Sequence, residues 1–294
     1  MKRILLFVVT NFLVMIAFSL LWHVVSLVYP LDAVAGQYYG PLLVFFFIWG
    51  MGGAFVSLLI SKWMAKRVYG VVTIDPRTSS GNERYLVEKV YDIARREGLR
   101  EMPEVGIYES QEVNAFATGP SRKNSLVAVS SGLLQQMDSV EVEGVLAHEV
   151  AHVANGDMVT MTLIQGVINA FVLFFSRILA DLVASQFEDE EGRGGGIFVR
   201  MGLNIFFQVI FGFLGMIVVA FFSRYREYRA DLGAAKSVGK GPMIKALQRL
   251  QSMQERIEPD TGGLASLKIA APTSWFSTHP SLEDRISRLE RARM

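Results

Sequence analysis

The chain of 294 residues contains no cysteine, which excludes disulfide bonds and thiolate metal ligands and gives no indication of the redox compartment. Histidine is almost as scarce, with four residues. Charged residues make up only 19% of the chain against 51% hydrophobic residues, and a net charge of +1 gives no reason to expect nucleic-acid binding. A water-soluble protein of this length would rarely be so apolar.

Charged residues are missing altogether from four long stretches. These charge-free stretches are Ile4–Tyr29, Ala33–Ser61, Met158–Ser176 and Met201–Ser223. Each is close to the roughly 20 apolar residues that a helix needs to cross a bilayer. The first is longer than the apolar core of a cleavable signal peptide, and no small-residue cleavage site follows it. We therefore predict an integral membrane protein with four transmembrane helices, for which the lipid bilayer is a partner.

The positions of lysine and arginine predict how these spans are oriented. Basic residues precede the first span and follow the second and fourth spans, at Lys2, Arg3, Lys62, Lys66, Arg67, Arg224, Arg226 and Arg229. This places both termini and both soluble segments in the cytoplasm. The chain then divides into a membrane hairpin (1–61), a soluble segment (62–157), a second hairpin (158–223) and a soluble tail (224–294).

The soluble segments have the pattern of a mixed α+β domain. Apolar periodicity predicts a helix over 82–97 that stops at Gly98, followed by short strands at 105–108, 113–118 and 126–129. Asp138 and Glu141 have the spacing of a capping box, which opens a helix. The fourth span is expected to continue as a helix to residue 238, and a last helix is expected over 281–293. The predicted fold is a mainly α membrane protein whose α+β domain is assembled from two soluble segments.

The predicted helix after Asp138 carries the sequence His148-Glu149-Val150-Ala151-His152. Residues four apart lie on one face of a helix, so His148 and His152 can bind one Zn²⁺ ion through their imidazoles. Glu149 lies next to the first ligand, where its carboxylate can act as a general base on a water molecule. Two ordinary histidines on a helix surface are the alternative interpretation. Mn²⁺ or Co²⁺ could also bind such a site, although the ligands favour zinc.

Two histidines leave a catalytic zinc one protein ligand short. The candidates are His23, His279 or a carboxylate, and Glu227 is the strongest. Glu227 and Asp231 share a helical face, so Glu227 can bind the metal while Asp231 hydrogen-bonds the ring of a ligand histidine. A hairpin of the third and fourth spans would return Glu227 to the membrane face on which His152 lies. An ordinary charged helix remains the alternative.

Further residues have two candidate roles each. His279 is the first candidate for stabilising the oxyanion of the reaction and Tyr228 is the second, although His279 could instead be a turn residue before Pro280. Asp157 could contact a ligand or cap the next helix, and its position favours the cap. The expected strand at Asn114, Ala115 and Phe116 offers an edge for an extended substrate, or else belongs to the plain core of the sheet.

Together these features resemble the HtpX family of membrane-bound zinc metalloproteases, part of the peptidase family that includes the CAAX prenyl proteases. The resemblance rests on the motif from His148 to His152, the run Glu227–Asp231 and the four charge-free stretches. Residues Asn114–Gly119 and Ser277–Pro280 also match, so the resemblance covers essentially the whole chain.

The resemblance implies a gluzincin-like fold with one Zn²⁺ per chain. It also implies an endopeptidase whose substrates are misfolded or damaged membrane proteins. Cleavage would occur at the cytoplasmic face of the cell inner (plasma) membrane, as part of quality control and the stress response. The oligomeric state is not predicted.

Two other functions fit parts of the pattern. An intramembrane metalloprotease would carry its zinc motif inside a span, but Glu141, Glu143 and Asp157 flank the motif here. A membrane adaptor or receptor that binds zinc without hydrolysis would not need Glu149.

Overall fold

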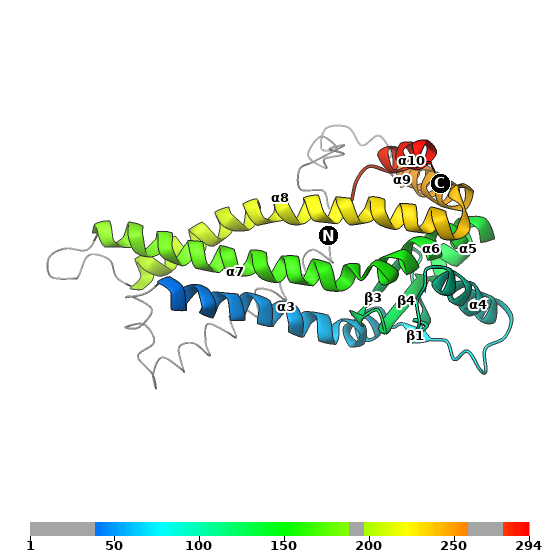
Figure 1. Ribbon diagram of the computed structural model, residues 1–294, viewed down its shortest axis with the longest axis horizontal. Helices are drawn as coiled ribbons and strands as arrows, with labels where there is room; N and C mark the ends of the chain where they lie inside the picture. The colour runs from blue at the N-terminus through cyan, green and yellow to red at the C-terminus, as the bar shows by residue number, and fades with distance from the viewer. Residues whose placement is uncertain (1–38, 188–196, 258–278, 294) are drawn as a thin grey trace. The chain divides into compact units, whose positions relative to one another are not determined.

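The computed structural model describes residues 39–187, 197–257 and 279–293 (Figure 1). The elements in chain order are α3 (Tyr39–Tyr69), β1 (Val72–Thr73), α4 (Gly81–Arg96), β2 (Glu104–Tyr108), β3 (Ala115–Ser121), β4 (Asn124–Ser130), α5 (Ser131–Gln136), α6 (Ser139–Asn155), α7 (Asp157–Ala184), the 3₁₀-helix η1 (Ser185–Phe187), α8 (Ile197–Val238), α9 (Lys240–Ile257) and α10 (Leu282–Arg291). The chain divides into two compact units, which are described separately.

The first unit contains Thr162–Met216 and the chain up to Ser57. Its helices belong to three segments that are long and apolar enough to cross a membrane, namely Val44–Tyr69, Asp157–Ala184 and Ile197–Val238. These segments overlap the second, third and fourth predicted spans. The first predicted span, with His23, lies outside the described residues. Large apolar side chains such as Phe198, 82% exposed, face outward, as expected for contact with lipid.

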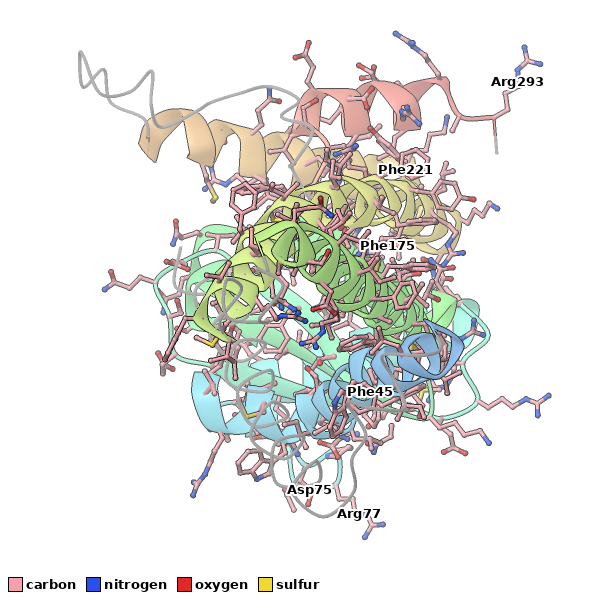
Figure 2. All side chains as sticks on the ribbon, turned by 90° about the vertical axis from the view of Figure 1, so that its left-hand side faces the viewer. Phe45, Asp75, Arg77, Phe175, Phe221 and Arg293 are labelled. Atoms are coloured by element: carbon pink, nitrogen blue, oxygen red, sulfur yellow. The ribbon has the colours of Figure 1, made fainter. Side chains whose placement is uncertain are left out.

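Small residues bring the helices of this unit close together. A Cβ atom on Gly50 of α3 would lie only 2.8 Å from the carbonyl oxygen of Gly166 on α7, and one on Gly215 of α8 would lie 2.6 Å from Ile168. Phe175, marked in the end-on view of Figure 2, packs against Phe211 of α8 with ring centroids 6.1 Å apart. Lipid leaves little hydrophobic driving force between helices, so this close packing supplies the attraction.

The second unit contains Leu58–Met161 and the chain from Ile217 onward. Its four-stranded sheet has the order β1-β2-β4-β3, with β2 parallel to β4 and β3 antiparallel to it. Val127 and Val129 of β4 face the main core, which α4 and α6 also build. The alternate residues Leu126 and Ala128 pack on the other face. Figure 1 shows α4 and α6 beside the strands, and α9 and α10 next to each other.

Helix α6 begins and ends at well-defined caps. Asp138 accepts hydrogen bonds from the amides of Val140 and Glu141 at 2.8 Å, and the Glu141 carboxylate accepts one from the Asp138 amide at 2.9 Å. This confirms the predicted capping box. The helix ends at Gly156, whose φ of 70° lies in the left-handed region that favours glycine. Asp157 then begins α7.

Most of the elements expected from the sequence are present. The helix predicted over 82–97 is α4, the helix predicted to continue to 238 is α8, and the helix predicted over 281–293 is α10, which Ser281 caps by accepting from the Asp284 amide. The strand predicted at 113–118 begins at Ala115, because the Asn114 amide donates to the Ser130 side chain. Three elements, β1, α5 and α9, were not predicted from the sequence, and β1 is too short to have a pattern.

Gly144 lies one turn before His148, where α6 crosses α9. A Cβ atom at this position would collide with the carbonyl oxygen of Pro242 and lie 3.0 Å from the Cβ of Ala246. We expect Gly144→Ala to cost about 1–3 kcal/mol of stability, because packed backbones must move apart. Thermal unfolding of the purified protein would measure this loss. Gly241→Ala is the matched control, since nothing lies within 4 Å of a Cβ there, and an equal loss in both variants would contradict the steric explanation.

Candidate metal centre

Three side chains that are far apart in the sequence meet in the second unit. The Nε2 atoms of His148 and His152 lie 3.1 Å apart. The Glu227 carboxylate lies 3.4 Å from Nε2 of His148 and 3.3 Å from Nε2 of His152. Ligand atoms around a tetrahedral zinc are separated by about 3.3–3.4 Å, given Zn–N bonds of roughly 2.0–2.1 Å. The three groups therefore fit a single zinc ion.

Two helices position these groups. His148 and His152 lie four residues apart on α6, so both rings project from one face of the helix. Glu227 comes from α8, which continues as one helix beyond the charge-free stretch that ends at Ser223. All three residues are buried, and the Glu227 side chain is only 2% exposed.

Each histidine has a carboxylate on the ring nitrogen that faces away from the other two groups. Oδ1 of Asp231 lies 2.9 Å from Nδ1 of His148, and Oδ2 of Asp157 lies 2.7 Å from Nδ1 of His152. A proton on Nδ1 can be donated to these carboxylates, which leaves Nε2 free to bind a metal. Burial opposes charge on His148, but the hydrogen bonds to Asp231 and Glu227 outweigh it and raise the pKa of this imidazole to about 9.

Asp157 therefore differs from its expected role as a helix cap. Its carboxylate is buried, and its two oxygens face the ring of His152 and the guanidinium of Arg229. Sequence analysis favoured the cap because Asp157 directly precedes a long helix. The left-handed break at Gly156 turns the chain so that Asp157 reaches back to the motif, and this change of direction is not visible in residue spacing.

Arg285 of α10 is a residue that the sequence analysis did not identify. Its Nε and Nη2 atoms donate to the two oxygens of Asp231 at 2.8 and 2.6 Å. Its Nη1 lies 3.5 Å from the Glu227 carboxylate, and its side chain is only 8% exposed. The adjacent carboxylates outweigh the effect of burial and raise the pKa of this guanidinium further above its usual value, so it stays charged.

One signal in the sequence could have revealed Arg285. Leu282, Ile286 and Leu289 are three or four residues apart, as expected for the apolar face of a helix, and all three pack against the core. Arg285 falls on this same face. A charged residue on an apolar face is rarely buried without a partner, so the pattern indicates a buried ion pair.

The expected catalytic residues lie around this centre. Glu149 is half-buried, and in the described part of the chain its carboxylate has no hydrogen bond or ion pair. His279 places Nδ1 3.2 Å from the Glu227 carboxylate, with 63% of its side chain exposed. Tyr228, the second candidate for the oxyanion, donates its hydroxyl to Asp284 instead, and Arg288 covers its ring.

The expected substrate strand is β3, one of the two edge strands of the described sheet. Ala115 of β3 packs toward the main core. The ring of Phe116 points to the other face, where it contacts Tyr69 and Tyr108 at centroid distances of 5.2 and 5.6 Å. The side-chain amide of Asn114 donates to the Tyr108 hydroxyl at 2.7 Å. The side chains of Asn114 and Phe116 are thus engaged within the protein, and the main chain of β3 pairs with β4 along one edge.

Two histidines and a glutamate around one point, with a further glutamate beside the first histidine, are the groups with which zinc metallopeptidases work. The profile of Peptidase family M48 matches residues 80–293, and the chain belongs to this family. It is thus a zinc metallopeptidase, with helices long and apolar enough to span a membrane.

Proteins of similar sequence match along almost the whole chain. The chain is 50% identical over 302 residues to "Protease HtpX homolog" of Bacillus subtilis and 49% identical over 296 residues to "Protease HtpX" of Shewanella baltica. Both comparisons cover 98% of this chain and 99% of the relative. The crystal structure of S. mikatae Ste24p is similar in fold, with a TM-score of 0.55 at 18% identity. That similarity covers 87% of this chain and 63% of Ste24p.

The ion pair of Arg285 with Asp231 should dominate the local stability. We expect Arg285→Met to cost about 3–5 kcal/mol, because it leaves the buried Asp231 carboxylate without its counter-charge. This loss corresponds to a decrease of roughly 10 °C in the midpoint of thermal unfolding. Arg291→Met, on the exposed side of the same helix, should change the midpoint little. Equal midpoints for the two variants would contradict the importance of this pair.

Proposed function

We propose that this chain is an integral membrane zinc endopeptidase that cleaves misfolded or damaged membrane proteins at the cytoplasmic face of the membrane. The observation that carries the proposal is the buried triangle of His148, His152 and Glu227, with the uncommitted carboxylate of Glu149 beside it. The three residues would hold one Zn²⁺ ion. When bound, this ion supplies an acidified water and a polarised substrate carbonyl.

Glu149 is the general base of the proposed reaction. It takes a proton from the attacking water and later gives it to the amine that leaves. This role requires a carboxylate that no cation neutralises, and the neighbouring Arg285 is already bound to Asp231. Asp231 and Asp157 meanwhile keep the proton of each ligand histidine on Nδ1.

We assign the stabilisation of the oxyanion to His279. Its ring lies beside the Glu227 carboxylate and is well exposed, so it can reach a group that enters from solvent. Hydrogen-bond donors aimed at the position where negative charge develops are a large source of catalysis. Tyr228 is less suited to this role because its hydroxyl is bound to Asp284.

The outer edge of β3 is the proposed binding site for the substrate main chain. The Ser130 amide donates to the Asn114 carbonyl at 2.9 Å and the Asn114 amide donates to the Ser130 hydroxyl, so both main-chain groups of Asn114 point toward β4, as in a hydrogen-bonded pair. Such pairs alternate along an antiparallel ladder, and the amides and carbonyls of Ala115 and Ala117 are therefore directed away from β4. An extended substrate can pair with these groups irrespective of its side chains, which suits a protease with varied unfolded substrates.

The proposed orientation in the membrane rests on the distribution of charge. We propose four spans with both termini in the cytoplasm of the cell, the protein being a multi-pass component of the inner (plasma) membrane. The domain organisation remains 1–61, 62–157, 158–223 and 224–294, with a gluzincin-like domain formed by the second and fourth segments. Asp157 and Arg224 directly flank the charge-free stretches, which supports a metal centre near the membrane surface.

Removal of the general base should separate metal binding from catalysis. Glu149→Gln in the detergent-purified protein should lower the cleavage of an unfolded, fluorescently labelled test protein at least about 100-fold, because proton transfer contributes roughly 10²–10⁴-fold. Zinc content, measured by atomic absorption, should stay at one ion per chain. Glu143→Gln is the matched control, since Glu143 lies on the same helix but pairs with Lys89. A wild-type protein that binds zinc and cleaves nothing would contradict the proposal.

The edge of β3 can be tested by removing a single amide. Ala117→Pro should raise the KM for the test protein about three- to tenfold with little change in kcat, because one main-chain hydrogen bond is worth about 0.5–1.5 kcal/mol. Proline is tolerated where the amide faces outward from an edge strand. Ala117→Gly keeps the amide and should retain the wild-type KM. If both variants raise KM equally, the strand does not bind substrate through this amide.

A further inference from the structure

Both motif histidines are held by an aspartate that is in turn held by an arginine. His148 contacts Asp231, which binds Arg285. Next to His152, Oδ2 of Asp157 lies 2.7 Å from Nδ1 of the ring, and the other oxygen of Asp157 accepts a hydrogen bond from the guanidinium of Arg229. The same chemical order occurs twice, although its members come from different helices.

We propose that Arg229 is a positioning residue of the metal centre, which orients His152 through Asp157. The inference rests on the proposed binding of metal by His152. Helix α8 would then contribute two residues to the metal centre, Glu227 and Arg229. Glu227 of this helix faces the motif histidines directly, and Arg229 fixes the carboxylate that sets the orientation of the second histidine.

The position of Asp157 explains why an arginine is needed. Asp157 is the first residue of α7, where the positive end of the helix attracts a carboxylate. That attraction competes with the hydrogen bond to His152. The guanidinium of Arg229 holds the carboxylate from the other side, with the Asp157 side chain only 1% exposed. Without this contact, the hydrogen bond to His152 alone would oppose the attraction of the helix end.

Arg285 and Arg229 differ in their surroundings. The side chain of Arg285 is 8% exposed, whereas 44% of the Arg229 side chain is exposed. If Arg229 is replaced, water can therefore enter the space that its side chain leaves, and the protein should still fold. This makes Arg229 the better position at which to separate orientation of a ligand from stability of the protein.

The test measures metal binding rather than cleavage. Zinc affinity would be determined by competition with a chelator for the full-length, detergent-purified protein carrying Arg229→Met, Arg229→Lys, Asp157→Asn or the double change Asp157→Asn/Arg229→Met. The absorption spectrum of the Co²⁺-loaded protein would report the geometry of the ligands. Arg224→Met is the matched control, since it removes the same charge from the same helix five residues earlier.

We expect Arg229→Met to weaken zinc binding about tenfold and to shift the Co²⁺ spectrum, since partners of ligand histidines commonly contribute 10- to 100-fold. Arg229→Lys should recover most of the affinity. The double variant should bind zinc no more weakly than Asp157→Asn, because both changes act through one carboxylate. Wild-type affinity in Arg229→Met, independent losses in the double variant, or an equal loss in Arg224→Met would each overturn the inference.

Two further variants distinguish this inference from the proposed function. His152→Ala and Glu227→Gln should each lower zinc affinity at least about 100-fold if these residues bind the metal. If both retain the wild-type affinity, the proposed metal centre is wrong and the role of Arg229 falls with it. If both lose zinc while Arg229→Met binds it normally, the metal centre stands and only the positioning role is overturned.

Discussion

The carboxylate of Glu227 is almost completely withdrawn from solvent, and burial of a charge is unfavourable unless partners of opposite charge or hydrogen-bond donors surround it. His148 and His152 face it from α6, and Arg285 approaches it from α10. The two imidazoles and the guanidinium are themselves buried, so they need hydrogen-bonding partners as well. Asp231 is the partner of both His148 and Arg285. The helices of this unit thus meet where they do because a network of buried charges must be complete.

Two helices, α7 and α8, connect the polar site to charge-free stretches of the chain. The charge-free stretch of α7 begins immediately after Asp157, and that of α8 ends at Ser223, four residues before Glu227. Each helix therefore changes from lipid-compatible to charged sequence within about one turn. A metal centre built at these changes can use rigid helices as its support without placing charged residues in the hydrocarbon region, where they would be costly.

Local patterns in the sequence account for much of the fold and for the candidate ligands. The i,i+4 spacing of His148 and His152, and that of Glu227 and Asp231, places each pair on one helical face before any tertiary structure is known. The capping box at Asp138 likewise depends on neighbouring residues only. The spacing of Leu282, Ile286 and Leu289 indicates that Arg285 is buried, but it does not identify Asp231 as the partner, because that contact joins α10 to α8.

Other features also depend on contacts over long distances. The ring of Phe116, on the strand expected to bind substrate, packs against Tyr69 of α3, and no local pattern indicates that contact. The short strand β1 exists because Val72 and Thr73 pair with β2, and two residues are too few to show an alternation.

The break at Gly156 makes the site sensitive to the length of the chain as well as to its residues. In an uninterrupted helix, positions 152 and 157 would be separated by about 140° around the axis, so their side chains could not meet. The left-handed conformation of Gly156 interrupts the helix, and Asp157 lies against the ring of His152. A one-residue insertion or deletion between them would turn the carboxylate away even if every polar residue were retained. Sequence comparison at this junction therefore has to treat a gap as a functional change.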